Sequence, residues 1–261
     1  MDINDICKYI QSAELRAAGL ILQAHDILSE DKSDRRDVVT EYDRRVQALL
    51  IEELGAAVPG ARFFCEETDE RERADSERLF VIDPIDGTMN FVRGFGHSCI
   101  SVAYAERGQA LAGAVYNPYL REMFCAVRGG GAYLNGRRLR IRDVPLRDSV
   151  VCFGTAPYRP DLSERTFRLA RALFDASLDV RREGSAALDL CSVAAGRAGL
   201  YVELDLSLWD HAAGALIAAE AGAVCLTPEG APLPFTGEKS GIAAGTPRAM
   251  QDYLDLAEGM E

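Results

Sequence analysis

A ten-residue stretch, residues 79–88, restricts the fold of this chain more than any other part of its sequence. It opens with four apolar residues, 79–82, whose β-branched bias is typical of a buried strand. Two carboxylates, Asp83 and Asp86, follow three positions apart with Pro84 between them. Because proline fixes φ and has no backbone N–H, we predict that the strand stops here and turns in one defined way. Open α/β sheets place ligands at the carboxyl ends of their strands, so this turn is a candidate site.

The residues that follow the two acids favour an anion. Gly87 lets the backbone approach a ligand closely, and the N–H groups of Gly87 and Thr88 can point at a negative group. Acids and an anion share one turn only if cations lie between them. A plain surface turn is the alternative, because Asp, Pro and Gly are common turn residues. The buried strand that leads into the turn favours a metal-bridged phosphate site.

Charge and composition exclude several classes of function. The net charge of −12 argues against a nucleic-acid partner, and it repels a phosphate monoester unless bound cations reverse the local field. The 261 residues, 48% of them hydrophobic, are ordinary for a globular protein with a large core. No apolar run has the length of a membrane span, and the acidic N-terminus lacks a signal-peptide pattern. We therefore expect a cytoplasmic protein with no membrane partner.

The seven cysteines indicate buried free thiols rather than a disulfide framework or a zinc site. Their number is odd, they are widely spread, and no C-x-x-C occurs. The three histidines are scattered too, which makes zinc improbable, and we assign His211 no role.

The first part of the chain reads as helices on a largely antiparallel sheet. Apolar residues at helical spacing (Ile6, Ile10, Leu15, Ala18 and Leu22) predict a helix over 3–28, and the polar run 30–37 predicts a mobile loop. A second helix opens at 38–43, where Thr40 and Asp43 form a variant capping box. Further strands are expected at 61–65, 98–105, 110–117 and 122–127, with a hairpin at Asn135-Gly136.

Strands and helices alternate in the rest of the chain, which favours an α/β arrangement of strands between helices. Strands are predicted at 150–153, 178–180, 200–203, 223–226 and 242–244, and helices at 162–175, 186–195, 209–221 and 247–256. We expect two halves, 1–148 and 149–261, joined as one compact catalytic unit. A doubly wound oxidoreductase fits poorly, because no glycine fingerprint follows a strand.

Three more acids are candidates, although each has a sufficient structural explanation. Asp43 completes the capping box, and Asp210 suits the positive end of a helix that begins near Trp209. Glu66 opens a charged run that is mostly solvated surface, and we assign its neighbour Glu67 to solvent. Glu66 nevertheless follows a buried strand directly, as Asp83 does, so the two carboxylates can converge on one ion.

Taken together, these motifs resemble the inositol monophosphatase family across nearly the whole chain. The run Asp83 to Thr88, continuing into Met89-Asn90-Phe91, looks like its central signature. Residues 40–43 are similar to its T-x-x-D element, residues 64–67 to its G-E-E element, and residues 208–210 to its W-D element.

The resemblance implies an α-β-α-β-α sandwich of the inositol monophosphatase and fructose-1,6-bisphosphatase type, and Mg²⁺-dependent hydrolysis of a phosphate monoester. It implies two or three Mg²⁺ ions per site, which suits carboxylate oxygens, and a homodimer sensitive to Li⁺. The first ion would be held by Glu66, Asp83 and the Ile85 carbonyl, and the second by Asp83, Asp86 and Asp210. Catalysis would use Glu66, Thr88 and Asp43, with phosphate at Gly87 and Thr88. Substrate would meet Asp86, Ala186, Glu203 and Asp210, under a mobile loop that contains Lys32.

The sequence departs from the family pattern at two places beside the expected site. Cys65 stands where glycine is usual, and Gly96-His97 replaces a Gly-Phe-Pro segment. Inositol monophosphate is the expected substrate, with fructose 1,6-bisphosphate, 3′-phosphoadenosine 5′-phosphate and histidinol phosphate as alternatives. A catalytically silent metal- or ligand-binding regulator on the same fold is a further alternative.

Overall fold

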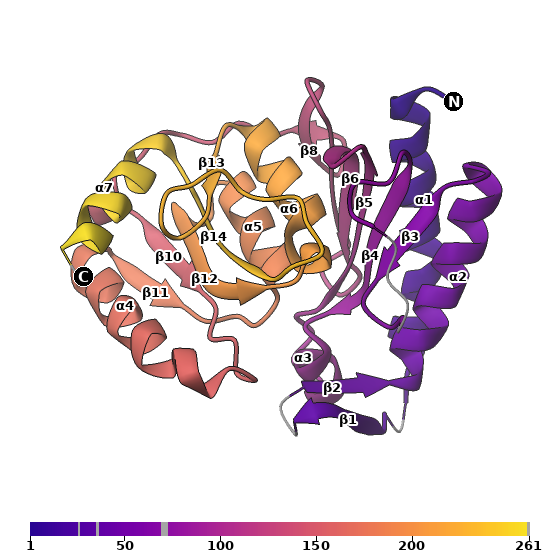
Figure 1. Ribbon diagram of the computed structural model, residues 1–261, viewed down its shortest axis with the longest axis horizontal. Helices are drawn as coiled ribbons and strands as arrows, with labels where there is room; N and C mark the ends of the chain where they lie inside the picture. Colours follow the sequence, from indigo (N-terminus) through magenta and orange to yellow (C-terminus); the bar gives the residue numbers. More distant parts are fainter. Residues whose placement is uncertain (26, 35–36, 69–72, 260–261) are drawn as a thin grey trace.

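In the computed structural model, the helices and sheets form five alternating layers (Figure 1). The structure describes residues 1–25, 27–34, 37–68 and 73–259. Helices α1 (Ile3–Leu22) and α2 (Glu41–Ala57) form one outer layer, and α4 (Ser163–Ala176) and α7 (Pro247–Glu258) form the other. Between them lie two sheets separated by α5 (Ala186–Ala194) and α6 (Leu208–Ala221), so the predicted α-β-α-β-α sandwich is confirmed.

The first sheet is largely antiparallel, as predicted, and has seven strands within the described residues. Its strands follow chain order: β3 (Arg62–Cys65), β4 (Leu79–Asp86), β5 (Cys99–Glu106), β6 (Gln109–Asn117), β7 (Glu122–Val127), β8 (Gly131–Leu134) and β9 (Arg137–Arg138). Among the described strand pairs of this sheet, only β3 and β4 run parallel. The β8–β9 turn is the predicted hairpin, with positive φ at both Asn135 and Gly136.

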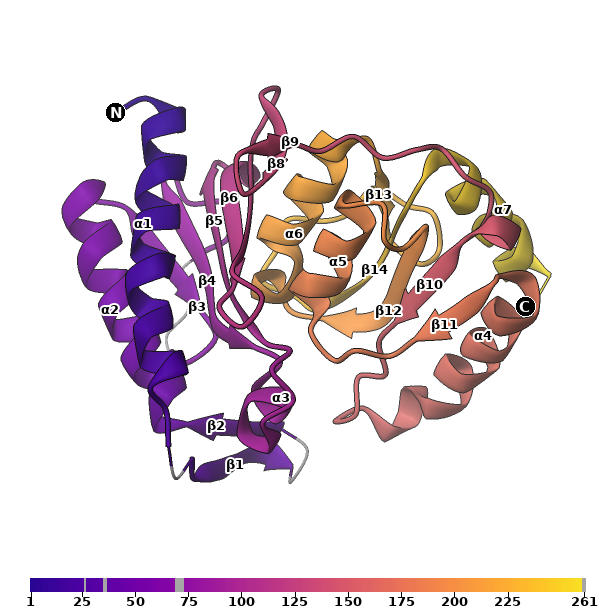
Figure 2. The same ribbon diagram turned by 180° about the vertical axis from the view of Figure 1, so that it is seen from behind.

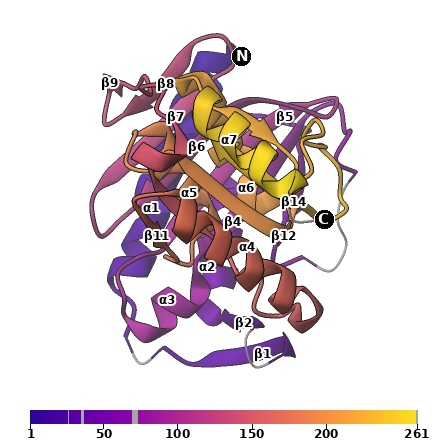
Figure 3. The same cartoon turned by 90° about the vertical axis from the view of Figure 1, so that its left-hand side faces the viewer.

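The second sheet has the order β11-β10-β12-β14-β13 among the residues described. Its strands are β10 (Val150–Phe153), β11 (Asp179–Arg181), β12 (Leu200–Leu206), β13 (Val224–Leu226) and β14 (Ser240–Gly245). Strand β12 runs parallel to β10 and antiparallel to β14. Seen from the side, α4 and α7 cover the outer face of this sheet (Figure 3).

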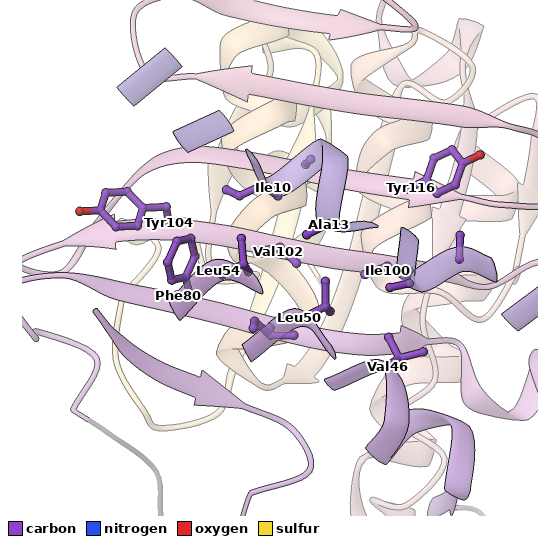
Figure 4. Packing of buried hydrophobic residues seen from close by; sticks show 14 of the residues in the cluster. Ile10, Ala13, Val46, Leu50, Leu54, Phe80, Ile100, Val102, Tyr104 and Tyr116 are labelled. Atoms are coloured by element: carbon purple, nitrogen blue, oxygen red, sulfur yellow. The ribbon is translucent and has the colours of Figure 1, made fainter. Parts of the chain in front are cut away.

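The two faces of the first sheet build two separate cores. Ile100, Val102 and Tyr104 of β5 face α1 and α2, where they meet residues such as Ile10 and Leu50 (Figure 4). The alternate residues of β5 face α6 instead. Seen from behind, α1 and α2 lie together against the outer face of β3–β6 (Figure 2).

Helix α6 can approach its neighbours closely because alanine and glycine residues occupy much of its buried face. A Cβ on Gly113 of β6 would come within 3.2 Å of the Ala213 backbone. A Cβ on Gly214 would lie 2.8 Å from the Leu190 side chain of α5. The helix therefore lies very close to the first sheet, which brings the start of α6 next to the end of β4.

Two predictions about the first part of the chain were wrong. The polar run 30–37 is no simple loop where it is described: β1 (Ser29–Asp34) pairs with β2 (Asp37–Thr40), and residues 35–36 lie outside the described residues. The first helix ends at Leu22, with Leu15 and Leu22 more than half exposed. None of the described helices combines the length and the apolar character needed to cross a bilayer.

Strand β4 does not stop at Pro84, as the sequence had suggested, but continues to Asp86. Asp83 pairs with Ser101 and Asp86 with Cys99, so one extra residue is accommodated between them. In a regular strand, residues three apart face opposite sides of the sheet. The irregularity around Pro84, which cannot donate to the ladder, therefore lets both aspartates reach the same site.

Candidate metal centre

Three aspartates from two distant parts of the chain meet at the end of β4. One carboxylate oxygen from each of Asp83, Asp86 and Asp210 lies within 4.8 Å of the others. Asp83 and Asp86 come from the irregular end of β4, and Asp210 comes from the first turn of α6. No other group of three or more His, Cys, Asp or Glu side chains within the described residues is placed to hold an ion in this way.

Backbone and hydroxyl donors hold one oxygen of each β4 aspartate. The Ile85 N–H donates to Asp83 Oδ1 at 3.1 Å. Asp86 Oδ2 accepts from Ser185 Oγ at 2.5 Å and from the Ala187 N–H at 2.8 Å. These contacts tie Asp86 to the start of α5 and leave its second oxygen for a ligand.

Asp210 is held in the same manner by the start of its own helix. The Ser207 N–H donates to Asp210 Oδ2 at 2.6 Å, which completes a capping box. The structural explanation of Asp210 is therefore correct, and it coexists with a place in the acidic cluster.

The ionised forms of these crowded aspartates are unfavourable unless a cation is bound between them. Burial, and then the charges of Glu66, Asp86 and Asp210, raise the pKa of Asp83 well above its ordinary value. Burial, Glu66 and Asp86 likewise raise the pKa of Asp210. Burial raises the pKa of Asp86 to about 6 despite its hydrogen bonds. Such an all-oxygen set of carboxylates fits a hard divalent ion, because the ion would replace the mutual repulsion with attraction.

Asp43 lies beside Thr88, as the resemblance implied. Asp43 Oδ2 accepts from the Thr40 N–H at 2.8 Å and from Thr40 Oγ1 at 2.5 Å. Its other oxygen lies 3.4 Å from Thr88 Oγ1, which also lies 3.0 Å from the Ile85 carbonyl oxygen. Burial raises the pKa of Asp43 to about 6. The capping box and the link to Thr88 are therefore both present.

Glu66 is close to the aspartates but is paired with a lysine. The Cys65–Ile82 register of the parallel strands β3 and β4 places Glu66 beside Asp83, as predicted. Lys32 of β1 donates to Glu66 Oε1 at 2.8 Å and also to Glu67 Oε1. The Lys32 ammonium group thus lies beside the acidic cluster as a positive charge. Its position shows that the cluster attracts cations, which supports the metal assignment.

The assignment of Glu67 to solvent was wrong. Its side chain is only 8% exposed, and its backbone N–H and carbonyl both pair with the Gln47 side chain. Burial and the charge of Glu66 raise the pKa of Glu67 to about 7. Nothing in the sequence indicates this burial, because Glu67 stands in a run of charged residues and its contact with Lys32 of β1 depends on the tertiary fold.

The turn at Gly87 requires glycine. Its φ is +84°, and a Cβ would meet the carbonyl oxygens of Gly184 and His97 at 3.1 Å each. Gly87 caps α3 (Thr88–Arg93), a six-residue helix that opens beside the acidic cluster. Asn90 in α3 donates to the carbonyls of His97 and Glu183 at 2.8 Å each, so the turn is fixed to the segment before α5.

A cleft of about 310 Å³ opens from the acidic cluster toward the second sheet. Its wall includes Glu203 of β12, whose two carboxylate oxygens accept from the Ala156 N–H at 2.9 Å and the Tyr201 hydroxyl at 2.7 Å. The predicted substrate residues Ala186 and Glu203 thus line the same cleft as Asp86 and Asp210. Sequence reasoning missed Ser185, which also caps α5, and Asp189, because no local motif marks either residue as part of a site.

Gly154 leaves the space that the Glu203 carboxylate fills. A Cβ at position 154 would lie 1.8 Å from Glu203 Oε2, well inside van der Waals contact. We expect Gly154→Ala to displace this carboxylate from the cleft wall and, for the phosphate monoester that the family resemblance implies, to lower kcat/KM by about tenfold or more. Thermal melts would separate this effect from unfolding. Gly55→Ala is the control, because a Cβ at this position meets only ordinary van der Waals contacts. Gly108 is unsuitable, because its φ of +78° would strain an alanine.

Neither departure from the family pattern removes a group from the cluster. The Cys65 side chain is buried in the core under α2 rather than directed at the aspartates. His97 Nε2 lies 3.2 Å from Glu183 Oε2, so it joins the turn after α3 to the segment before α5. All seven cysteines are free, and five of them are buried, as predicted.

Known proteins with similar sequences and structures show which family the chain belongs to. The model of the inositol monophosphatase family matches residues 6–258. The chain is 37% identical over 257 residues to the Nus factor SuhB of Vibrio cholerae, covering 96% of this chain and 89% of that protein. It is 41% identical over 188 residues to an inositol-1-monophosphatase of Mesorhizobium japonicum, covering 71% and 70% of the two chains. The structure of the extragenic suppressor protein suhB from Bartonella henselae superimposes with a TM-score of 0.88, at 32% identity and 98% coverage of both chains. The chain therefore belongs to the inositol monophosphatase family.

Proposed function

We propose that this protein is an Mg²⁺-dependent phosphatase that hydrolyses inositol monophosphate to inositol and phosphate. The observation that carries the proposal is the meeting of Asp83, Asp86 and Asp210 within 4.8 Å at the mouth of a polar cleft. Family membership supports a phosphatase with a divalent-metal site. The choice of Mg²⁺ follows from the carboxylate donors, and the choice of inositol phosphate follows from the family resemblance.

The proposed ligand sets follow the resemblance. One ion would be held by Glu66, Asp83 and the Ile85 carbonyl. A second would be held by Asp83, Asp86 and Asp210, and the proposal allows two or three ions per site. When bound, divalent ions supply an activated water and neutralise the charge that develops on the phosphoryl and leaving-group oxygens. Glu66 would exchange its contact with Lys32 for the ion, so Lys32 would move to the edge of the site.

The remaining site residues would bind the substrate and orient the attacking water. The backbone at Gly87 and Thr88 would receive the phosphoryl oxygens, in the turn that only glycine can form here. Asp43 and the Ile85 carbonyl would fix the Thr88 hydroxyl, which orients the attacking water through a hydrogen bond. Glu203, held by two donors, would accept from a hydroxyl of the alcohol half, next to Ala186.

Chelation provides the first test of this proposal. We expect phosphate release from inositol 1-phosphate to stop when a chelator is added and to return with Mg²⁺, because no zinc-type ligand takes part. Recovery with Zn²⁺ alone would contradict the oxygen-donor assignment. By the family resemblance, millimolar Li⁺ should inhibit the restored activity.

A panel of substrates separates the alternatives. Fructose 1,6-bisphosphate, 3′-phosphoadenosine 5′-phosphate and histidinol phosphate belong in it beside inositol 1-phosphate. Relatives named Nus factor SuhB favour a second candidate, a role in which binding rather than turnover matters. A protein that binds Mg²⁺ but hydrolyses no member of the panel would support that candidate.

We also propose that the protein is a homodimer, with the β-rich region before residue 128 in the interface. Exposed apolar side chains there include Phe95, 74% exposed, and Leu120, 60% exposed. Light scattering at micromolar concentration is expected to give twice the mass of one chain. A monomeric mass, or a dimer that Leu120→Lys leaves intact, would argue against this interface.

A further inference from the structure

One buried carboxylate in the cleft lacks the partners that its neighbours have. Asp189 lies in the first turn of α5, lines the cleft, and is only 1% exposed. Among the described residues, its Oδ1 has no hydrogen-bond partner. A buried acceptor without a partner typically destabilises a protein by about 1–3 kcal/mol, and one that lines a cleft can gain its missing hydrogen bond from a ligand.

Glu203, in the same cleft, is a carboxylate whose hydrogen bonds are supplied by the protein. Both of its oxygens accept hydrogen bonds from the protein, at 2.9 Å and 2.7 Å. Asp189 occupies the same wall, but the side chain that hydrogen-bonds to its carboxylate is the Cys152 thiol, which is a weak donor. Its unpartnered Oδ1 is therefore an acceptor in this wall whose hydrogen bond a ligand can supply.

We propose that Asp189 is a specificity-determining residue whose Oδ1 accepts a hydrogen bond from a hydroxyl group of the alcohol half of the substrate. This inference rests on the proposed function, because it assigns a contact to the polyol, which is the leaving group when the phosphate ester is hydrolysed. Asp189 would select polyol phosphates over phosphate esters of alcohols without further hydroxyls.

The charges around Asp189 favour a hydroxyl over other groups. Burial, and then Glu183, are the largest influences that raise its pKa, and Glu203 and Asp86 act in the same direction. This acidic surrounding would repel a second phosphate. A hydroxyl is a neutral donor that can approach without such repulsion. Sites built to bond a substrate hydroxyl discriminate strongly against analogues that lack it.

The test compares two substrates in the Mg²⁺-loaded full-length protein. The measured quantity is the ratio of kcat/KM for inositol 1-phosphate to kcat/KM for 4-nitrophenyl phosphate, which has no hydroxyl group. In Asp189→Ala we expect this ratio to fall about tenfold, through KM for inositol 1-phosphate. Asp189→Asn keeps an acceptor oxygen and should recover most of the ratio. A ratio unchanged in Asp189→Ala, or lowered equally in both variants, would overturn the proposal.

Substrate analogues keep the test decisive if Asp189→Ala fails to fold. In the wild type, one inositol 1-phosphate analogue that lacks a single hydroxyl should show a similar tenfold loss. If Asp189→Ala folds, its kcat/KM should be the same for that analogue as for inositol 1-phosphate. Equal turnover of all such analogues by the wild type would overturn the proposal. Failure of the proposed function looks different, because the wild type would then hydrolyse neither inositol 1-phosphate nor 4-nitrophenyl phosphate.

Discussion

Asp83→Asn is expected to lower kcat for inositol 1-phosphate by roughly a thousandfold or more while the fold is retained. Asp83 would serve both ions, and its loss would leave each with fewer charged ligands. The asparagine can still accept from the Ile85 N–H, so the local turn should persist. The measurement is phosphate release at saturating Mg²⁺, beside far-UV circular dichroism.

The same variant should be more stable than the wild type when metal is absent. The raised pKa of Asp83, caused first by burial, means that its ionised form destabilises the metal-free fold at neutral pH. A neutral asparagine removes that repulsion, so Tm without metal should rise while activity falls. Glu52→Gln, at an exposed position on α2, is the control, since Glu67 is buried beside the site. Full activity in Asp83→Asn, or equal damage from Glu52→Gln, would refute the ligand assignment.

Glu14→Met is expected to stabilise the protein by about 2–4 kcal/mol near neutral pH. Glu14 lies on the buried face of α1 with 0% of its surface exposed, among apolar residues of the first core. Among the described residues, neither of its carboxylate oxygens has a hydrogen-bond partner. Methionine fills a similar volume without a polar group, whereas Glu14→Gln should stabilise less because its amide also lacks partners.

The stabilisation by Glu14→Met should depend on pH. Burial raises the pKa of Glu14 well above its ordinary value of 4.5, so the folded state holds this proton more tightly than the unfolded state does. The free energy of unfolding of the wild type therefore falls as pH rises from 4.5 through the raised pKa. Urea unfolding across this range should show the advantage of Glu14→Met growing with pH. A constant difference, or a less stable Glu14→Met, would contradict this account.

Elements with a regular apolar pattern could be predicted from the sequence alone. The strand at 150–153 and the hairpin at Asn135-Gly136 lie where they were expected, because burial of one face or a fixed turn chemistry leaves few alternatives. The hairpin β1–β2 has neither feature, since its first strand, residues 29–34, consists of polar and charged residues. Helix α3 has only six residues, too few for a periodic pattern.

The candidate site was predictable where a motif and a strand end coincide. Asp83 and Asp86 follow such an end, and the structure brings Asp210 to them through α6. The burial of Glu67 and Asp189 depends instead on how the hairpin and the two helices pack, which local sequence does not encode. Glu14 was detectable in principle, since it falls between Ile10 and Ala17 on the face that α1 buries.

The central claim, that the aspartates at the end of β4 and the start of α6 hold the catalytic metal, is tested most directly by a Mg²⁺ titration. The measurement is the initial rate of inositol 1-phosphate hydrolysis against Mg²⁺ concentration for the wild type and Asp210→Asn. Asparagine can still accept from the Ser207 N–H, so the helix start should be preserved. The account predicts that half-saturation moves to about tenfold or more Mg²⁺ and that kcat falls. Superimposable titrations of the two proteins would contradict it.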